Sequence, residues 1–126
     1  MRRGALRDFD PVDFLKIADE LALRPDEASH RTAISRAYYG AFLLTRERLL
    51  LIIPALVKYR LSPEIHRALV VELRRRGRRD IADRLRELRR MRNISDYDIS
   101  TKVAQADARY AIELANIIIS RVRGLA

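Results

Sequence analysis

Apolar residues recur at helical spacing along most of the chain, and no segment alternates with the period of two that a half-buried strand requires. Proline, glycine and acidic residues interrupt this pattern at intervals. The pattern predicts helices from Asp10 to about Ala22, Pro25 to about Ile53, Ser62 to Gly77, Asp80 to about Tyr97, and Ser100 to Gly124. Five helices with short connections predict an all-α fold, a five-helix antiparallel up-and-down bundle that forms a single domain, 1–126.

The helix boundaries rest on capping chemistry. Asp10-Pro11 and Pro25-Asp26 each place a proline beside an acidic residue that can accept hydrogen bonds from the first turn. Ser62, Asp80 and Ser100 are the expected N-caps of the later helices. Pro54 is expected to end or kink the second helix, and Gly77 to stop the third after three arginines.

An arginine interrupts the apolar stripe of the fourth predicted helix. Ile81, Leu85 and Leu88 recur at i, i+4 and i+7, and the next position on their stripe is Arg92. Such a stripe normally faces the core, so Arg92 is expected to point into a groove or interface. A cation there needs a partner, and Asp96, one turn later, is within reach of an ion pair.

Two predicted helices carry more apolar surface than a single core contact requires. Small residues in the second helix, including Ala33, Ala37 and Gly40, permit close approach of another helix, and the fifth helix is apolar most of the way round. Helices of this kind are sandwiched or lie at a subunit interface. The pattern therefore predicts a homodimer, and a central helix buried within one bundle is the alternative.

The composition limits the chemistry. The 126 residues include no cysteine, which excludes disulfides and thiolate metal sites. His30 and His66 are too few and too far apart for a zinc motif, so no metal or cofactor is expected. The longest apolar run, Leu49 to Val57, is too short to cross a bilayer, and the first residues lack the apolar segment of a signal peptide. A cytoplasmic protein without membrane contact is expected.

The charge is positive and unevenly placed. The chain has a net charge of +9, and the segment from Arg74 to Arg92 holds ten arginines against three acidic residues, a net +7. A positive stripe of this kind is the electrostatic footprint of a polyanion partner. A solvated helix face is the alternative interpretation.

Two stretches resemble a known family. Residues 31–42, RTAISRAYYGAF, resemble the R-x-A-x-S-R-A-Y-Y-A-x-F signature of small HEPN-domain proteins, and RNISDYD at 92–98 resembles their R-x-x-A-D-Y segment, with Ser95 in place of alanine. The resemblance covers about Asp10 to Val122. It implies a bundle of five helices, usually homodimeric, often encoded beside a minimal nucleotidyltransferase protein. Many members act as metal-independent ribonucleases in toxin–antitoxin systems.

The motif departs from the ribonuclease members at one position. Those members place an arginine, commonly followed by asparagine, four to six residues before a histidine. Arg92 and Asn93 match the start, but the histidine position falls on Tyr97 or Asp98. RNA cleavage without metal needs a general base, and arginine stays protonated. Because Asp96 and Asp98 are weak bases at neutral pH, the usual ribonuclease activity is not expected.

These observations lead to a HEPN-type protein that binds RNA or nucleotide in a cleft around Arg92. Arg92, Asn93 and Asp96 are the candidate catalytic residues, and the candidate binding residues are Arg36, Tyr39, Arg89 and Tyr97. Two alternatives remain: an active ribonuclease toxin in which Asp96, Asp98 or a histidine from another helix is the base, and a structural dimerisation module.

Two further expectations concern aromatic residues. Because adjacent helical side chains diverge by about 100°, one of Tyr38 and Tyr39 is expected to pack in the core. The other then presents its hydroxyl at the surface or to Asp96. His66, near a helix start, is expected to be a surface or capping residue.

Overall fold

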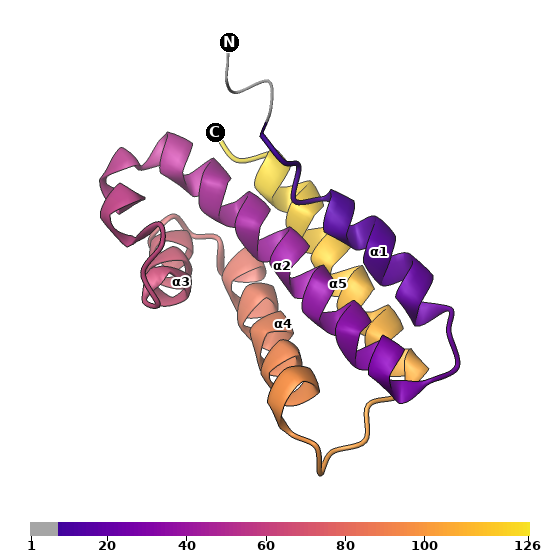
Figure 1. Ribbon diagram of the computed structural model, residues 1–126. Helices are drawn as coiled ribbons and strands as arrows, with labels where there is room; N and C mark the ends of the chain where they lie inside the picture. Colours follow the sequence, from indigo (N-terminus) through magenta and orange to yellow (C-terminus); the bar gives the residue numbers. More distant parts are fainter. Residues whose placement is uncertain (1–7) are drawn as a thin grey trace.

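The computed structural model describes residues 8–126 and is helical, with no strand in that range. The α-helices are α1 (Asp13–Ala22), α2 (Glu27–Ile52), α3 (Ile65–Arg75), α4 (Arg79–Tyr97) and α5 (Gln105–Arg123), and a 3₁₀ helix, η2 (Pro54–Tyr59), follows α2 (Figure 1). The prediction of an all-α fold is confirmed.

Three of the predicted boundary signals act as expected. The Asp26 carboxylate accepts a hydrogen bond of 3.0 Å from the Ser29 N–H and caps α2. Pro54 follows the end of α2 and opens η2. Gly77 ends α3 with φ +74°, a left-handed conformation that side chains with a Cβ rarely adopt.

The predicted N-caps of α4 and α5 are wrong. Asp80 lies inside the first turn of α4, where its carboxylate pairs with Arg78 at 3.1 Å and with Arg121 of α5 at 2.9 Å. Ser100 lies in the loop before α5, because its hydroxyl donates to Asp98 at 2.6 Å. The start of α5 is closed instead by Asp107, whose carboxylate accepts the Ala104 N–H at 2.8 Å.

The other two starts are also shifted. Ser62 accepts the Glu64 N–H at 3.1 Å, and α3 begins at Ile65. Asp10 accepts the Val12 N–H at 3.0 Å in a turn that precedes Asp13, the first residue of α1. Both side chains therefore stabilise the entry turn, and each helix begins a few residues later than expected.

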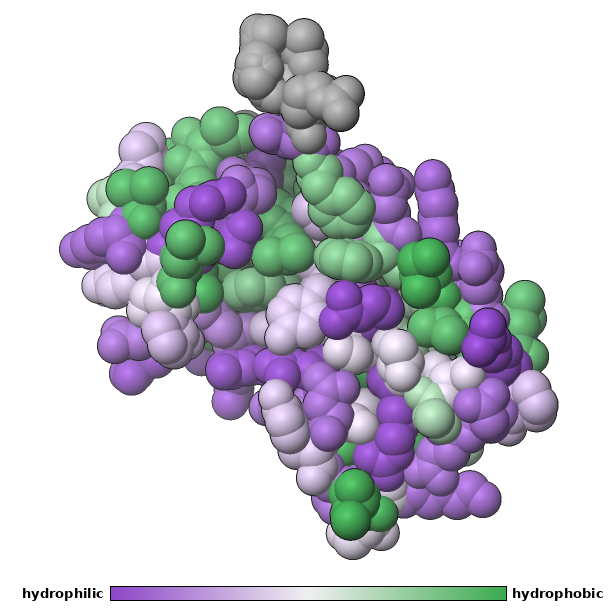
Figure 2. All heavy atoms as spheres, in the orientation of Figure 1, coloured by the Kyte–Doolittle hydropathy of each residue, from purple (hydrophilic) through white to green (hydrophobic). Residues whose placement is uncertain are grey.

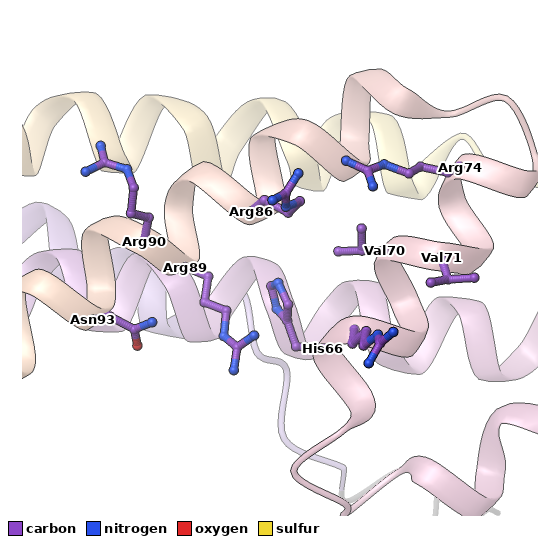
Figure 3. A pocket seen from close by; sticks show the side chains of 9 residues that line it. His66, Val70, Val71, Arg74, Arg86, Arg89, Arg90 and Asn93 are labelled. Carbon is purple, nitrogen blue, oxygen red and sulfur yellow. The ribbon is translucent and has the colours of Figure 1, made fainter.

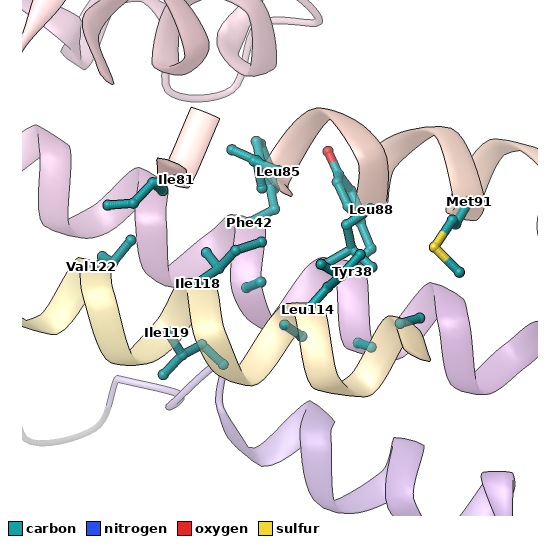
Figure 4. Packing of buried hydrophobic residues seen from close by; sticks show 14 of the residues in the cluster. Tyr38, Phe42, Ile81, Leu85, Leu88, Met91, Leu114, Ile118, Ile119 and Val122 are labelled. Carbon is teal, nitrogen blue, oxygen red and sulfur yellow. The ribbon is translucent and has the colours of Figure 1, made fainter. Parts of the chain in front are cut away.

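The core lies between α2, α4 and α5. Leu85 and Leu88 of α4 face Leu114 and Ile118 of α5 across Phe42 of α2 (Figure 4). Burial of these side chains is the main favourable term in folding, about 25 cal/mol for each Å² of apolar surface removed from water. In contrast, α3 packs only on α2, η2 and α4, and so borders the core from one side.

The helix α2 and its neighbour α5 run parallel. Val103, before α5, donates to the Glu27 carboxylate at 3.1 Å, and Arg48, near the end of α2, donates to the Leu125 carbonyl beyond α5 at 3.1 Å. The expectation of antiparallel neighbours is therefore wrong for this pair. The physical reason is that η2 and α3 lie between α2 and α4, so α4 runs back along α2 and α5 returns in the direction of α2 (Figure 1).

Close packing of α1 on α2 depends on Gly40. A Cβ atom at this position would overlap Cδ2 of Leu15 and lie 3.2 Å from the carbonyl oxygen of Pro11. The close approach that the small residues of α2 predict thus occurs within this chain.

The surface has one apolar region near the end of α2. Figure 2 shows apolar side chains gathered at the upper left, over the end of α2 and η2. The strongly exposed residues of this part of the chain are Leu51, Val57 and Leu61. None of the described helices is long and apolar enough to cross a membrane.

Candidate functional site

Arg92 lies on the inner side of α4. Its side chain is only 12% exposed, and the residues that precede it on the same stripe, Ile81, Leu85 and Leu88, are fully buried. The Arg92 Cζ atom lies 5.2 Å from the ring centroid of Tyr38 and 5.4 Å from that of Tyr39. The predicted inward orientation is confirmed, and the aromatic faces partly compensate the buried charge.

Arg92 is only partly neutralised. The predicted pair with Asp96 exists, but Nη1 lies 3.7 Å from Oδ2, too far for a good hydrogen bond. Asp96 also accepts a hydrogen bond of 3.3 Å from Ser35 of α2. The Nε–H of Arg92 is buried and has no acceptor. A buried donor without a partner costs about 1–3 kcal/mol.

The tyrosine pair divides between core and surface. Tyr38 is 2% exposed, and its ring meets that of Tyr39 edge-on with centroids 5.0 Å apart. Tyr39 is half-buried, with the Arg36 Cζ atom 5.2 Å from its ring centroid. The expectation that one tyrosine packs in the core is confirmed for Tyr38, whose hydroxyl contacts His66.

His66 is buried, and the expectation of a surface or capping residue is wrong. The side chain is 6% exposed, and Nδ1 lies 3.0 Å from the Tyr38 hydroxyl oxygen. Burial, together with the nearby Arg89 and Arg92, lowers the pKa of His66 to about 4. Burial raises the pKa of Tyr38 to about 12. Both partners are therefore neutral at pH 7.

A pocket of about 580 Å³ lies beside this pair, between α3 and α4 (Figure 3). His66, Val70 and Val71 form its less polar part. The remaining lining residues are Arg67 and Arg74 of α3 and Arg86, Arg89, Arg90 and Asn93 of α4. No acidic side chain among the described residues lines this pocket. It is therefore a strongly positive cavity.

The arginines of the pocket differ in their pairing. Arg74 forms an ion pair with Asp83 at 3.4 Å, and Arg90 pairs with Glu87 at 3.0 Å. Within residues 8–126, Arg67, Arg86 and Arg89 form no ion pair. The Nε–H of Arg89 is buried without an acceptor, as is that of Arg92.

The candidate residues thus form two adjacent groups. The first group, called the Arg92 cleft after its expected role, comprises side chains that gather at Arg92 and do not line the α3/α4 pocket: Arg36, Tyr39, Arg92, Asp96 and Tyr97. Tyr97 is 74% exposed, with its ring centroid 6.0 Å from the Arg92 Cζ atom.

The other two candidates, Arg89 and Asn93, belong to the α3/α4 pocket. The hydrogen bond between Tyr38 and His66 joins the pocket to the cleft, because Tyr38 also lies under Arg92.

Arg31, the first residue of the RTAISRAYYGAF stretch, positions the end of α4, a role that the sequence analysis did not assign to it. Its Nη1 donates to the carbonyl oxygens of Ile94, Ser95 and Asp98 at 3.2, 2.9 and 3.0 Å, and its Nη2 donates to that of Thr101. Its Nε pairs with Glu27 at 3.0 Å. A cation is favourable at the carbonyl end of a helix, so Arg31 holds the last turn of α4 against α2.

The two missed residues differ in the signal that the sequence contains. His66 shares a stripe with Leu69, Val70 and Leu73, all of them buried, so the argument that turned Arg92 inward applies equally to His66. Arg31 is the first residue of the RTAISRAYYGAF stretch, but its role could not be inferred from it, since its acceptors are main-chain carbonyls at the end of α4 and in the loop that follows.

No family model, curated protein or solved structure matches this chain. No group of three or more His, Asp or Glu residues able to hold a metal ion occurs within 8–126. The side chains of the site supply cations, aromatic faces and a neutral histidine–tyrosine pair. This set is suited to binding an anion that also carries a planar ring.

Proposed function

We propose that this chain is a HEPN-type helical protein of a HEPN/minimal-nucleotidyltransferase, toxin–antitoxin-like system. It binds RNA or nucleotide in the Arg92 cleft and lacks the Arg/His ribonuclease activity of the family. The observation that carries the proposal is the inward guanidinium of Arg92, whose carboxylate partner Asp96 lies 3.7 Å away. A phosphate oxygen at the exposed part of the guanidinium would neutralise the charge.

The surroundings of Arg92 suit a nucleotide. Arg36 and Arg89 provide further cations for phosphate, and Asn93 provides an amide at the edge of the pocket. Tyr39 and the exposed Tyr97 offer aromatic rings near the cation. Stacking of a base on an aromatic ring contributes about 1–3 kcal/mol and does not depend on sequence.

The absence of cleavage follows from the carboxylates near Arg92. Asp98 accepts hydrogen bonds from Ser100 and Thr101, which lower the pKa of its carboxyl and make it a weaker base. Asp98 is therefore poorly suited to remove a proton from a ribose hydroxyl at neutral pH, and the Asp96 carboxylate is engaged by Arg92 and Ser35.

The test compares Arg92→Gln with Arg79→Gln, which removes the same charge from an exposed position of α4. Arg92→Gln should weaken binding of a labelled single-stranded RNA at least about tenfold, since a charge-assisted hydrogen bond contributes about 1.5–3 kcal/mol. Fluorescence anisotropy gives the affinities, and thermal melting shows whether both variants fold. Equal losses in the two variants contradict the proposal.

A second candidate function is an active metal-independent ribonuclease. The observation in its favour is His66, a histidine from another helix that lines the α3/α4 pocket beside Arg89. Its pKa of about 4 makes the ring no stronger a base than a carboxylate, which weighs against this alternative. RNA incubated with the protein and a chelator should then be cleaved, and His66→Gln should abolish cleavage. Intact RNA after prolonged incubation rules out this alternative.

The partners belong to the same proposal. We expect a cytoplasmic homodimer with the five-helix HEPN arrangement and a minimal nucleotidyltransferase protein as its second partner. The exposed apolar side chains of Leu51, Val57 and Leu61 provide surface for one of these contacts. Sedimentation equilibrium over a wide concentration range measures the dimer. A structural dimerisation module is favoured if Arg92→Ala weakens the dimer and leaves RNA binding unchanged.

A further inference from the structure

We propose that the α3/α4 pocket is a separate binding site for a phosphomonoester, the dianionic end group of a nucleotide or of an RNA strand. Arg92 does not line this pocket, so the site is distinct from the Arg92 cleft. The identity of the ligand as a nucleotide rests on the proposed function. The preference for a phosphomonoester over an internal phosphodiester rests on the pocket itself.

Three arginines of the pocket carry positive charge that no carboxylate within 8–126 neutralises. Arg86 and Arg89 of α4 line the pocket (Figure 3), and Arg67 of α3 lines it as well. None of the three has an acidic partner among the described residues. Like charges at close range repel unless an anion lies between them. A ligand of charge −2 neutralises this group better than one of charge −1.

The pocket arginines also supply more hydrogen-bond donors than a single phosphate oxygen can use. The guanidinium groups of Arg67, Arg86 and Arg89 line the pocket and carry donors in planar forks. A phosphomonoester offers three terminal oxygens, whereas an internal phosphodiester offers two. The number of donors therefore favours an end group.

One part of the pocket is less polar than the rest. Val70, Val71 and the neutral ring of His66 line one part of it, and His66 adds no charge of its own at pH 7. Apolar surroundings strengthen the attraction between an anion and the arginines. The volume of about 580 Å³ lies within the usual range for a small-ligand site and admits a nucleotide.

The test uses one single-stranded RNA oligonucleotide in three forms: with a 5′-phosphate, with a 3′-phosphate and with hydroxyls at both ends. At least one phosphorylated form should bind about tenfold more tightly than the hydroxyl form, which can offer the pocket only internal phosphodiesters. An end phosphate carries one more negative charge than a phosphodiester, and this charge near the guanidinium groups accounts for the gain. Equal affinity of all three forms overturns the proposal.

The pocket variant is Arg67→Gln/Arg86→Gln, which changes two exposed arginines that line the pocket. The matched control is Arg76→Gln/Arg79→Gln, which changes two exposed arginines outside it and removes the same charge. The preference for an end phosphate should disappear in the pocket variant and persist in the control. Loss of the preference in both variants attributes it to net charge and overturns the proposal.

A second readout separates this proposal from the proposed function. Sulfate, a dianion throughout the working pH range, should shift the imidazole NMR signals of His66 at constant ionic strength. It should not do so in the pocket variant. If no RNA binds, the proposed function fails and the sulfate titration alone decides whether the pocket proposal stands. If RNA binds through Arg92 but sulfate leaves His66 unshifted, only the pocket proposal fails.

The source of the end group is decided with adenosine 5′-monophosphate. An affinity equal to that of the phosphorylated RNA identifies a free nucleotide as sufficient. A much weaker affinity identifies the end of a strand as the ligand, with the rest of the strand in the Arg92 cleft. Both results support the pocket, and adenosine, which has no phosphate, is the control.

Discussion

Arg92 and His66 show how polar side chains enter the interior of this protein. Each occupies a position that its helix would normally give to an apolar residue. The cost of burying the polar group is offset differently in the two cases. Arg92 lies against tyrosine rings and a distant carboxylate, whereas His66 gives up its charge and bonds to Tyr38. Arg92 keeps one N–H donor without an acceptor, whereas the Tyr38 hydroxyl and His66 Nδ1 satisfy each other.

The depressed pKa of His66 predicts a pH dependence of stability. The unfolded chain binds a proton near pH 6.5 and the folded chain only near pH 4, so the unfolded state holds more protons in between. The free energy of unfolding should therefore rise by up to about 3 kcal/mol from pH 4 to pH 6.5 and then level off.

Urea denaturation at several pH values measures this dependence. His66→Gln lacks the titrating group, so its free energy of unfolding should depend less on pH over the same window. The difference between the two proteins removes the contribution of the carboxyl groups, which titrate in both. Parallel curves for the two proteins would contradict the assignment.

At the residue scale, the sequence predicted some positions and missed others for physical reasons. The helical stripe placed Arg92 correctly, and the same rule places His66, which was misassigned from its isolation in the chain and not from its helix face. The role of Arg31 could not be predicted, because its carbonyl acceptors come together only when the end of α4 and the loop after it fold against α2.

At the scale of helices, packing of α1 on α2 predicts the effect of one methyl group. Gly40→Ala adds a Cβ that overlaps Leu15, so α1 must shift or the leucine must leave its rotamer. Overpacking of this kind costs about 1–3 kcal/mol, and the better helix propensity of alanine returns up to about 1 kcal/mol. A net loss of about 1 kcal/mol is expected in chemical denaturation.

The chain provides a matched control for this substitution. A Cβ at Gly124 meets only the Arg121 carbonyl oxygen at 3.5 Å, an ordinary contact. Gly124→Ala should therefore leave the free energy of unfolding nearly unchanged. If Gly40→Ala is equally silent, α1 does not depend on close approach to α2.

The helices themselves were predictable, but several of their first residues were not. Apolar periodicity depends on local sequence and survives folding, so all five α-helices have counterparts in the pattern. Capping depends on which acceptor captures a side chain. Asp80 is held by arginines and Ser100 by Asp98, and both are thereby diverted from the role that their residue type favours.

At the scale of the whole molecule, the net charge of +9 predicts strong salt dependence of RNA binding. Phosphate contacts release counterions, with a slope of about −0.7 per contact on a plot of log affinity against log salt for single strands. Raising salt from about 50 to 200 mM should therefore weaken binding severalfold or more. An affinity that does not change over this range contradicts an electrostatic site.

The relative direction of the helices was the main feature that the sequence could not supply. A pattern of turns shows how many helices follow one another, but η2 and α3 change the course of the chain between α2 and α4. Nothing in their composition states that α5 will lie parallel to α2, and side-chain contacts such as Arg48 with Leu125 appear only in the folded structure.

The parallel pairing of α2 with α5 has a consequence for synthesis on the ribosome. Glu27 and Val103, which meet at one end of this pair, are separated by 76 positions in the chain. The hairpin of α1 and α2 therefore emerges with one apolar side uncovered, and the partner for that side is translated after α3 and α4. Contacts between distant segments slow folding, so the nascent chain should stay incompletely folded until α5 has left the exit tunnel.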